Sequence, residues 1–324
     1  AAAVGASGAR LVGSQQRRRR PAGRGGFDAF PAGRSLVAAR RSAEASGLQK
    51  LRVALAAAPV EEFSLTDGRG VCIYSSSEDV ASAIVAETAA EARAAIAEKG
   101  AFSLCVPGGF GPDENAVGGG ASFVAEALAG LSKADGLDFS RFHVFFCGER
   151  LDHEDTYVSA RKAWIDACGI PLDQVHAVPP GAFAEGVAAQ YTATICMQEE
   201  EVISDSPTGL PAVDLMLLDA SDDGTVGRLR PDSDEMREVG SEKVVLPVER
   251  RGEEAVALSM DFLNASRRAI VAAPAGCSAE HRRTMVSVAL GGVDAGAACP
   301  AGLVHAQRTT WLVEADAATA IPRP

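Results

Sequence analysis

Apolar side chains recur every four residues over a stretch that starts near residue 77. Val80, Ile84, Thr88, Ala92 and Ile96 would share one face of an α-helix. Serines at 75–77, followed by Glu78 and Asp79, supply an N-terminal cap and an acidic first turn. Gly100 is the type of residue that ends a helix. The spacing therefore predicts one long helix with a buried face, ending before Gly100.

Short apolar runs alternate with helical stretches along the rest of the chain. The runs predict strands at 70–74, 102–106, 142–147, 174–178, 213–218, 255–260, 269–273 and 310–313. The stretches between them predict further helices at 121–132, 157–168, 183–201, 261–267 and 279–290. This alternation indicates an α/β fold with a doubly wound, mostly parallel sheet flanked by helices. Residues 202–211 and 232–254 combine Pro, Gly and charges, which predicts loops or lids.

The first part of the chain lacks any sustained period. Residues 1–43 hold nine arginines, no lysine and one acid, which gives this segment a net charge of +8. Because the whole chain has a net charge of −12, residues 44–324 have a net charge of −20. We expect residues 1–58 to be a mostly disordered leader, with at most a short helix near 42–57, and residues 59–324 to form one domain. An Arg-rich, acid-poor leader is typical of a transit peptide, for a plastid rather than a mitochondrion. If it is instead a basic tail, the location would be cytoplasmic.

Composition limits the classes of partner. The acidic body repels phosphate, which argues against nucleic acid, and no apolar run approaches the ~20 residues of a membrane span. The seven cysteines form no CxxC pair and the five histidines lack metal-ligand spacing, so we expect no metal and a reducing compartment. Because neither a phosphate-binding loop lysine nor a G-x-G-x-x-G pattern is present, no cofactor is expected.

Three strand ends carry candidate chemistry. Gly108 and Gly109 follow the strand at 102–106, where backbone N–H groups can approach a sugar or phosphate, although a plain tight turn is the simpler interpretation. Glu149 and Arg150 follow the strand at 142–147, and an arginine there can bind a phosphate or form an ordinary surface ion pair. The apolar run 213–218 ends in small and acidic residues up to Pro231, and ligands of open α/β sheets bind at such strand ends.

These segments together resemble the 6-phosphogluconolactonases, of the wider glucosamine-6-phosphate isomerase-like group, over about residues 70–320. The family pattern G-x-G-x-D-G-H-x-x-S-L-F-P aligns with residues 219–231, and F-x-x-D-E-R aligns with 145–150. The segments V256-A-L-S and L263-N-A, and the Trp311 region, also match. The resemblance implies the same α/β fold and a small phosphorylated sugar or sugar acid as partner.

The chain departs from the family at the residues that carry the chemistry. The histidine of the pattern, a general base in the family, falls on Thr225, while Asp223 and Gly224 keep the pattern. Gly148 stands at the aspartate position, and Arg228 at a serine position. The phosphate-facing lysine of a separate family turn, T-G-x-x-K, falls on Ser278, and Arg230 replaces a phenylalanine of the first pattern.

By resemblance, the candidate catalytic positions are Thr225, Asp223 and Glu149. The candidate substrate-binding residues are Gly108, Gly109, Arg150, Gly224, Arg228 and Ser278.

Three interpretations remain open from the sequence. Either the protein belongs to carbohydrate metabolism of the pentose phosphate type with lost or weakened lactone hydrolysis, or it is an active lactonase with a substitute base. His153 is the histidine that the sequence places near a site segment. A third alternative is a non-catalytic sugar-phosphate-binding or structural subunit. The sequence thus leaves open whether this protein is an enzyme.

Overall fold

An eight-stranded sheet forms the centre of the computed structural model, which describes residues 58–107, 122–151, 155–250, 252–273, 279–291 and 298–323. These residues all belong to a compact unit, 48–324. The predicted helix near 42–57 lies outside the described residues, and the boundary between leader and domain stays a prediction.

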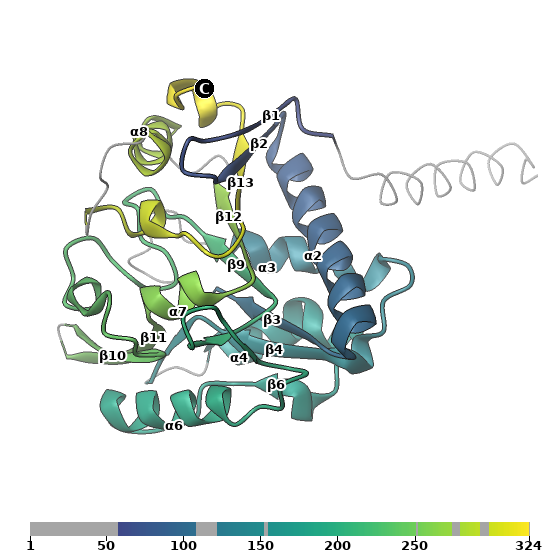
Figure 1. The fold of residues 1–324 in the computed structure, drawn as a ribbon, viewed down its shortest axis with the longest axis vertical. Coiled ribbons are helices and arrows are strands. Elements are labelled where there is room, and N and C mark those ends of the chain that lie inside the picture. Colours follow the sequence, from purple (N-terminus) through teal and green to yellow (C-terminus); the bar gives the residue numbers. More distant parts are fainter. Residues whose placement is uncertain are drawn as a thin grey trace, which may run out of the picture. The chain divides into compact units, whose positions relative to one another are not determined.

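The order of the sheet is β1-β2-β13-β12-β9-β3-β4-β6, and every neighbouring pair except β1 with β2 is parallel (Figure 1). Its strands are β1 (Glu61–Ser64), β2 (Gly70–Tyr74), β3 (Phe102–Val106), β4 (Phe142–Phe146), β6 (Val175–His176), β9 (Leu215–Asp219), β12 (Arg268–Ala273) and β13 (Thr309–Glu314). The predicted α/β class with a mostly parallel sheet is therefore confirmed.

Side chains alternate between two cores along each central strand. In β9, Leu215 and Leu217 belong to one buried cluster, whereas Met216 and Leu218 belong to the other. Both faces of the strand are buried, so its sequence is a continuous apolar run rather than an alternating one. Figure 1 shows α2 (Ser77–Lys99) on one side of the sheet and α8 (Ala279–Leu290) on the other.

Helix α2 has the ends that the sequence predicts. The Ser76 side chain accepts a hydrogen bond from the Asp79 N–H, and Gly100 at φ +90° closes the helix with an N–H bond to the Ile96 carbonyl. The other helices are α3 (Phe123–Leu128), α4 (Asp155–Ala160), α5 (Asp166–Cys168), α6 (Ala184–Cys196) and α7 (Met260–Ala265). A π-helical turn at 161–165 joins α4 to α5, and short 3₁₀ turns lie at 131–133, 139–141, 172–174, 235–238, 300–303 and 318–320.

A smaller antiparallel sheet lies partly where the sequence predicts loops, although its strand at 253–258 overlaps the strand predicted at 255–260. Strands β10 (Val245–Arg250), β11 (Glu253–Leu258) and β5 (Gly148–Arg150) pair in that order. The loop or lid prediction for 232–254 is wrong from residue 245 onward. Strand β10 lacks a clear apolar pattern because it contains Pro247 and charged residues. Both features are typical of an edge strand, where a missing N–H and exposed charges are tolerated.

Three further predictions are corrected. The segment 202–211 contains one half of a short hairpin of β7 (Ser204–Asp205) and β8 (Pro211–Ala212). The helices predicted at 183–201 and 121–132 are shorter than expected, because α6 ends at Cys196 and α3 at Leu128.

Candidate functional site

The order of the central strands brings the candidate segments to one edge of the sheet. From β3 the chain runs to β4 on one side, and from β9 it runs to β12 on the other side, so β3 and β9 flank a topological switch point (Figure 1). Crevices at such points, beyond the carboxyl ends of the strands, are where open α/β sheets bind ligands. Residues 219–230 follow β9 directly, and β5 follows β4 after one residue.

The loop after β9 is held by its own main chain. The Ser221 N–H donates to the Thr225 carbonyl at 3.0 Å, and the Thr225 N–H donates to Asp223 Oδ1 at 2.9 Å. Gly224 has φ +85°, and a Cβ there would lie 2.9 Å from the Cys299 sulfur. Glycine is therefore required at this position for both backbone and space.

Thr225 stands at the turn where the family pattern has histidine. Its Oγ1 is buried and has no hydrogen-bond partner among the described residues. Its hydroxyl is neither basic nor cationic near neutral pH, so it cannot act as the general base. Two other histidines stack on each other at strands β4 and β6, with His143 Nδ1 3.1 Å from His176 Nε2. The suggested substitute, His153, lies outside the described residues.

The two neighbouring acids of this loop have different surroundings. Asp222 forms an ion pair with Arg282 of α8 at 2.7 Å, and both side chains are largely buried. Arg282 also donates to the Ala220 carbonyl, so it ties the loop to the helix. Asp223 is exposed and accepts the Thr225 N–H. The candidate catalytic Asp223 thus has a clear local role in shaping the turn.

Asp219, at the end of β9, reaches across the switch point. Its Oδ2 accepts hydrogen bonds from the Ser122 hydroxyl and, at 3.5 Å, from the Val124 N–H at the start of α3, while Oδ1 is buried without a partner among the described residues. Burial raises the pKa of Asp219 to about 6, although the Ser122 and Val124 hydrogen bonds act in the opposite direction. A carboxyl group that titrates near neutrality can exchange protons in catalysis.

Asp219 and Arg282 are not among the site residues that the sequence predicts. Asp219 ends a buried strand and stands at a glycine of the family pattern, which is the signal that could have identified it. Arg282 has no comparable signal, because its partner is 60 residues earlier in the chain.

Glu149 is 8% exposed and firmly bound on β5. Its carboxylate accepts the Thr156 hydroxyl at 2.6 Å, the Thr156 N–H at 3.1 Å and the Arg150 N–H at 3.2 Å. Burial raises the pKa of Glu149, and the hydrogen bonds and the charge of Arg228 partly offset that rise. These contacts suit Glu149 to anchoring α4 against β5.

Arg150 and Arg228 line a cleft together with Arg230, and we call this the arginine cleft. Its volume is about 280 Å³, and its walls come from β5, the turn after β9, residues 231–235 and the β10–β11 hairpin. Asp223, Gly224 and Thr225 do not line it. The candidate residues therefore divide between the turn beside Cys299 and the arginine cleft, while Gly108, Gly109 and Ser278 lie outside the described residues.

Gly148 and Arg228 are packed against each other. A Cβ at Gly148 would lie 2.9 Å from Arg228 Cδ and 2.4 Å from the Val256 carbonyl oxygen. Gly227 and Arg228 have φ of +54° and +69°, as the central residues of a type I′ turn do. The aspartate that the family pattern carries at position 148 has no space in this arrangement.

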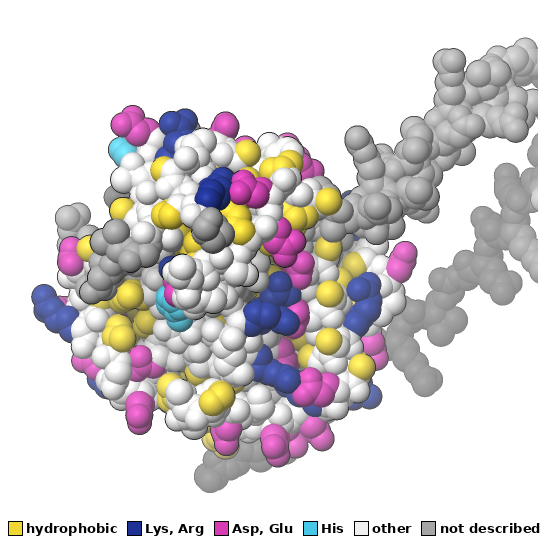
Figure 2. All heavy atoms as spheres, turned by 45° about the horizontal axis from the view of Figure 1, so that its top comes forward, with side chains coloured by type: hydrophobic (Ala, Val, Ile, Leu, Met, Phe, Trp, Pro, Cys, Tyr) yellow, Lys and Arg dark blue, Asp and Glu magenta, His cyan; other side chains and the backbone are white. Residues whose placement is uncertain are grey.

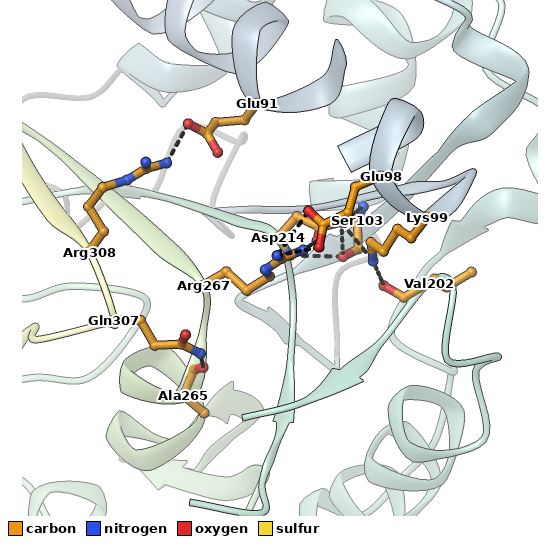
Figure 3. Close-up of polar contacts among 10 residues, drawn as sticks. All are labelled: Glu91, Glu98, Lys99, Ser103, Val202, Asp214, Ala265, Arg267, Gln307 and Arg308. Atoms are coloured by element: carbon orange, nitrogen blue, oxygen red, sulfur yellow. Dashed lines mark hydrogen bonds and ion pairs between the residues drawn. The ribbon is translucent and has the colours of Figure 1, made fainter. Parts of the chain in front are cut away.

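The opposite edge of the sheet holds a second polar cluster, centred on Asp214 (Figure 3). This carboxylate lies 3.0 Å from Lys99 Nζ and 3.4 Å from Arg267, and it accepts the Ser103 N–H at 2.8 Å and the Ser103 hydroxyl at 3.0 Å. Arg267 also contacts Glu98, which is more exposed. A neighbouring hollow of about 300 Å³ is lined by these and other paired charges.

Charges on the surface are mixed. Figure 2 shows Lys and Arg side chains interleaved with Asp and Glu side chains on the face in view. Among the described residues, no three His, Cys, Asp or Glu side chains are placed to share a metal ion. No helix in that part of the chain has the length and apolar character to cross a bilayer.

Comparison with known proteins gives one consistent result. The family model described as glucosamine-6-phosphate isomerases/6-phosphogluconolactonase matches residues 75–312. A Streptomyces coelicolor protein named 6-phosphogluconolactonase is 27% identical over 273 residues, which cover 80% of this chain and 97% of that protein.

A rice (Oryza sativa subsp. indica) protein named probable 6-phosphogluconolactonase 4, chloroplastic, is 31% identical over 169 residues. This match covers 50% of the present chain and 48% of the rice protein, so it spans only about half of either.

Solved structures of 6-phosphogluconolactonases have the same fold. The one from Leishmania guyanensis covers 81% of this chain and all of its own, with a TM-score of 0.62 at 18% identity. The one from Trypanosoma brucei covers 80% of this chain and 98% of its own, with a TM-score of 0.60 at 18% identity. At such identities the likeness concerns the fold alone.

Proposed function

Because the chain belongs to the glucosamine-6-phosphate isomerase/6-phosphogluconolactonase family, we propose that it binds a phosphorylated sugar lactone or sugar acid of the pentose phosphate type and hydrolyses the lactone weakly or not at all. Thr225 at the histidine position is the observation that carries this proposal. Loss of a general base typically lowers the rate by about 10²–10⁴-fold.

The change at Thr225 occurs together with others nearby. Gly148 replaces an acid of the family pattern, and Arg228 fills the space beside it. The turn is nevertheless well formed, because Gly224 keeps its required conformation and Asp223 its hydrogen bond to the main chain. These features support a retained binding edge with altered chemistry.

The decisive test is hydrolysis of 6-phosphogluconolactone by the full chain and by Thr225→His, against the rate in buffer. We expect the unaltered protein to stay near the buffer rate and Thr225→His to gain about 100-fold or more, with a rise in rate as the imidazole deprotonates. Thr225→Asn is the matched control, since it adds a polar side chain that does not titrate. A fast unaltered protein would refute the loss of activity.

A working lactonase with a substitute base is the second candidate function. Asp219 favours it, because its pKa is raised to about 6 and its Oδ1 is free of partners among the described residues. If this candidate is right, the unaltered protein is active and Asp219→Asn abolishes the activity. If hydrolysis is absent and 6-phosphogluconate does not bind, the third candidate, a structural subunit, is left.

We also propose a plastid location. The Arg-rich leader supports it, as do the rice relatives whose names include the word chloroplastic. A fluorescent protein fused after residue 58 should enter plastids, and a fusion in which Arg17–Arg20 are replaced by Gln should do so less efficiently. Cytosolic fluorescence of the first fusion would contradict the proposal.

A further inference from the structure

Helix α6 packs with its inner side against the small sheet, beside β10 and β11 (Figure 1). Four residues of that side belong to the buried core, namely Val187, Ala188, Tyr191 and Ile195. The Tyr191 hydroxyl accepts the Phe146 N–H at 2.8 Å and donates to the Phe146 carbonyl at 3.2 Å. These contacts determine which side of α6 is turned toward solvent.

The outer side of α6 has the two most exposed large apolar side chains in the part of the chain that the structure describes. Phe183, at the N-cap, is 70% exposed, and Met197, at the C-cap, is 82% exposed. Exposed residues recur between them at alternating spacings of three and four. We call this set the α6 face, and it consists of Phe183, Gly186, Gln190, Ala193 and Met197. Such spacing is that of the seam between two paired helices.

The α6 face is uncharged in a strongly charged protein. Charged residues make up 23% of the chain. Helix α2 has seven of them among 23 residues, whereas α6 has one, Glu185, among 13. A helix whose outer side meets only water is normally charged there. Because the chain has a net charge of −12, two copies repel each other, and an uncharged face is where they can approach.

The α6 face is complementary to itself when two such helices run antiparallel. With position 190 at the centre, Phe183 of one copy lies opposite Met197 of the other, a favourable pairing of a ring with a thioether. Gly186 lies opposite Ala193, and the space beside Gly186 is open, so the two backbones can come close. Gln190 meets its own copy at the two-fold axis, where its amide both donates and accepts a hydrogen bond.

We propose that the α6 face is an interface between two copies of this chain, with the two helices antiparallel and Gln190 on the two-fold axis. The face spans fourteen residue steps, or about 21 Å of helix. One helix from each copy makes a small interface, so we expect a dimer that forms at about micromolar chain and dissociates on dilution.

Sedimentation velocity of the full chain between about 1 and 100 μM tests the interface. We expect a shift from monomer to dimer as the concentration rises. Phe183→Glu and Met197→Glu should each weaken association by about tenfold or more, because each places a carboxylate against an apolar partner. Val60→Glu is the matched control, because Val60 is 62% exposed and lies outside α6. It should leave association unchanged, and circular dichroism shows whether each variant is folded.

Cysteine cross-linking of the full chain tests the antiparallel arrangement. The exposed Cys196 is first replaced by serine, and this Cys196→Ser chain without an added cysteine is the control. In oxidised glutathione, Phe183→Cys and Met197→Cys should link to each other in a mixture, and neither should link to itself, because like ends of the two helices are far apart. Gln190→Cys should link to itself, since the two copies of position 190 face each other.

The results that would overturn the proposal are distinct for its two parts. A full chain that stays monomeric up to about 100 μM, or a dimer that both glutamate variants leave intact, would overturn the interface. A dimer in which Phe183→Cys links to itself and not to Met197→Cys would overturn the antiparallel order. Neither measurement depends on lactone hydrolysis, so the outcome of the test with Thr225→His does not affect them.

Discussion

Two aspartates lie at the two ends of β9, and their carboxylates have different surroundings. Asp214, just before the strand, has Lys99, Arg267 and Ser103 around its carboxylate. Asp219, at the other end, has the Ser122 hydroxyl and the Val124 N–H on one oxygen and nothing described on the other. The distance between these aspartates is only one short strand.

The two ends of β9 therefore differ in whether a buried carboxyl group is neutralised by neighbouring cations. At the amino edge of the sheet, a buried charge is neutralised by cations, so the group is structural. At the carboxyl edge, a carboxyl group is desolvated and incompletely bound, so its protonated form is favoured. Perturbed and unsatisfied groups of this kind cluster at functional sites.

The largest expected effect is at the amino edge. Asp214→Ala would leave Lys99 and Arg267 without their buried partner and should lower the free energy of unfolding by about 3–5 kcal/mol. Urea unfolding followed by circular dichroism measures this. Glu98→Gln, which removes an exposed partner of Arg267, is the control and should have no measurable effect. Equal effects of both changes would remove the contrast between the two edges.

A smaller effect, of known sign, is expected at Asp219. Its folded pKa of about 6 is above the usual 3.8, so the stabilising contribution is complete below about pH 4 and is lost as the pH rises through 6. Asp219→Asn should therefore be more stable than the unaltered protein at about pH 7, by at most about 3 kcal/mol, and should lose that advantage at about pH 4. Urea titrations at both pH values test this; a constant difference would contradict it.

The smallest effect concerns the stacked histidines, which titrate in the opposite sense. Burial lowers the pKa of His176 from 6.5 to about 4, so its stabilising contribution is present above 6.5 and is lost as the pH falls toward 4. After a discount for the exposed part of the ring, the loss at about pH 5 is about 1 kcal/mol. In urea unfolding, His176→Gln should reduce the dependence of the free energy of unfolding on pH between about pH 4 and 6.5, which leaves the contribution of Asp219 easier to measure. An unchanged pH dependence would show that His176 is not the source of the loss.

The sequence predicts the large sheet well because its strands are buried on both faces. Continuous apolar runs such as 213–218, separated by helical periods, leave few alternatives. Strand β10 is not predictable in this way, because its pattern contains Pro247, Glu249 and Arg250. Its pairing with β11 is decided by the tertiary structure.

The sequence predicts at which edge of the sheet the candidate site lies, but it does not predict how the side chains of the site are arranged. Motif positions identify the turn at 221–225 and the arginines at 150 and 228 from the sequence alone. That these arginines line a cleft without Thr225 depends on how the small sheet packs beside the turn. The burial that raises the pKa of Asp219 depends on α3, whose start is about 100 residues earlier.

The tight contact at Gly148 restricts which side chains position 148 can hold. A side chain at position 148 meets the Val256 carbonyl oxygen before it meets Arg228, so trimming the arginine alone does not restore space for an aspartate. An aspartate at this position would require β5 and β11 to separate slightly as well. Gly148→Asp should therefore disturb the pairing of β5 with β11 even when the side chain at position 228 is shortened.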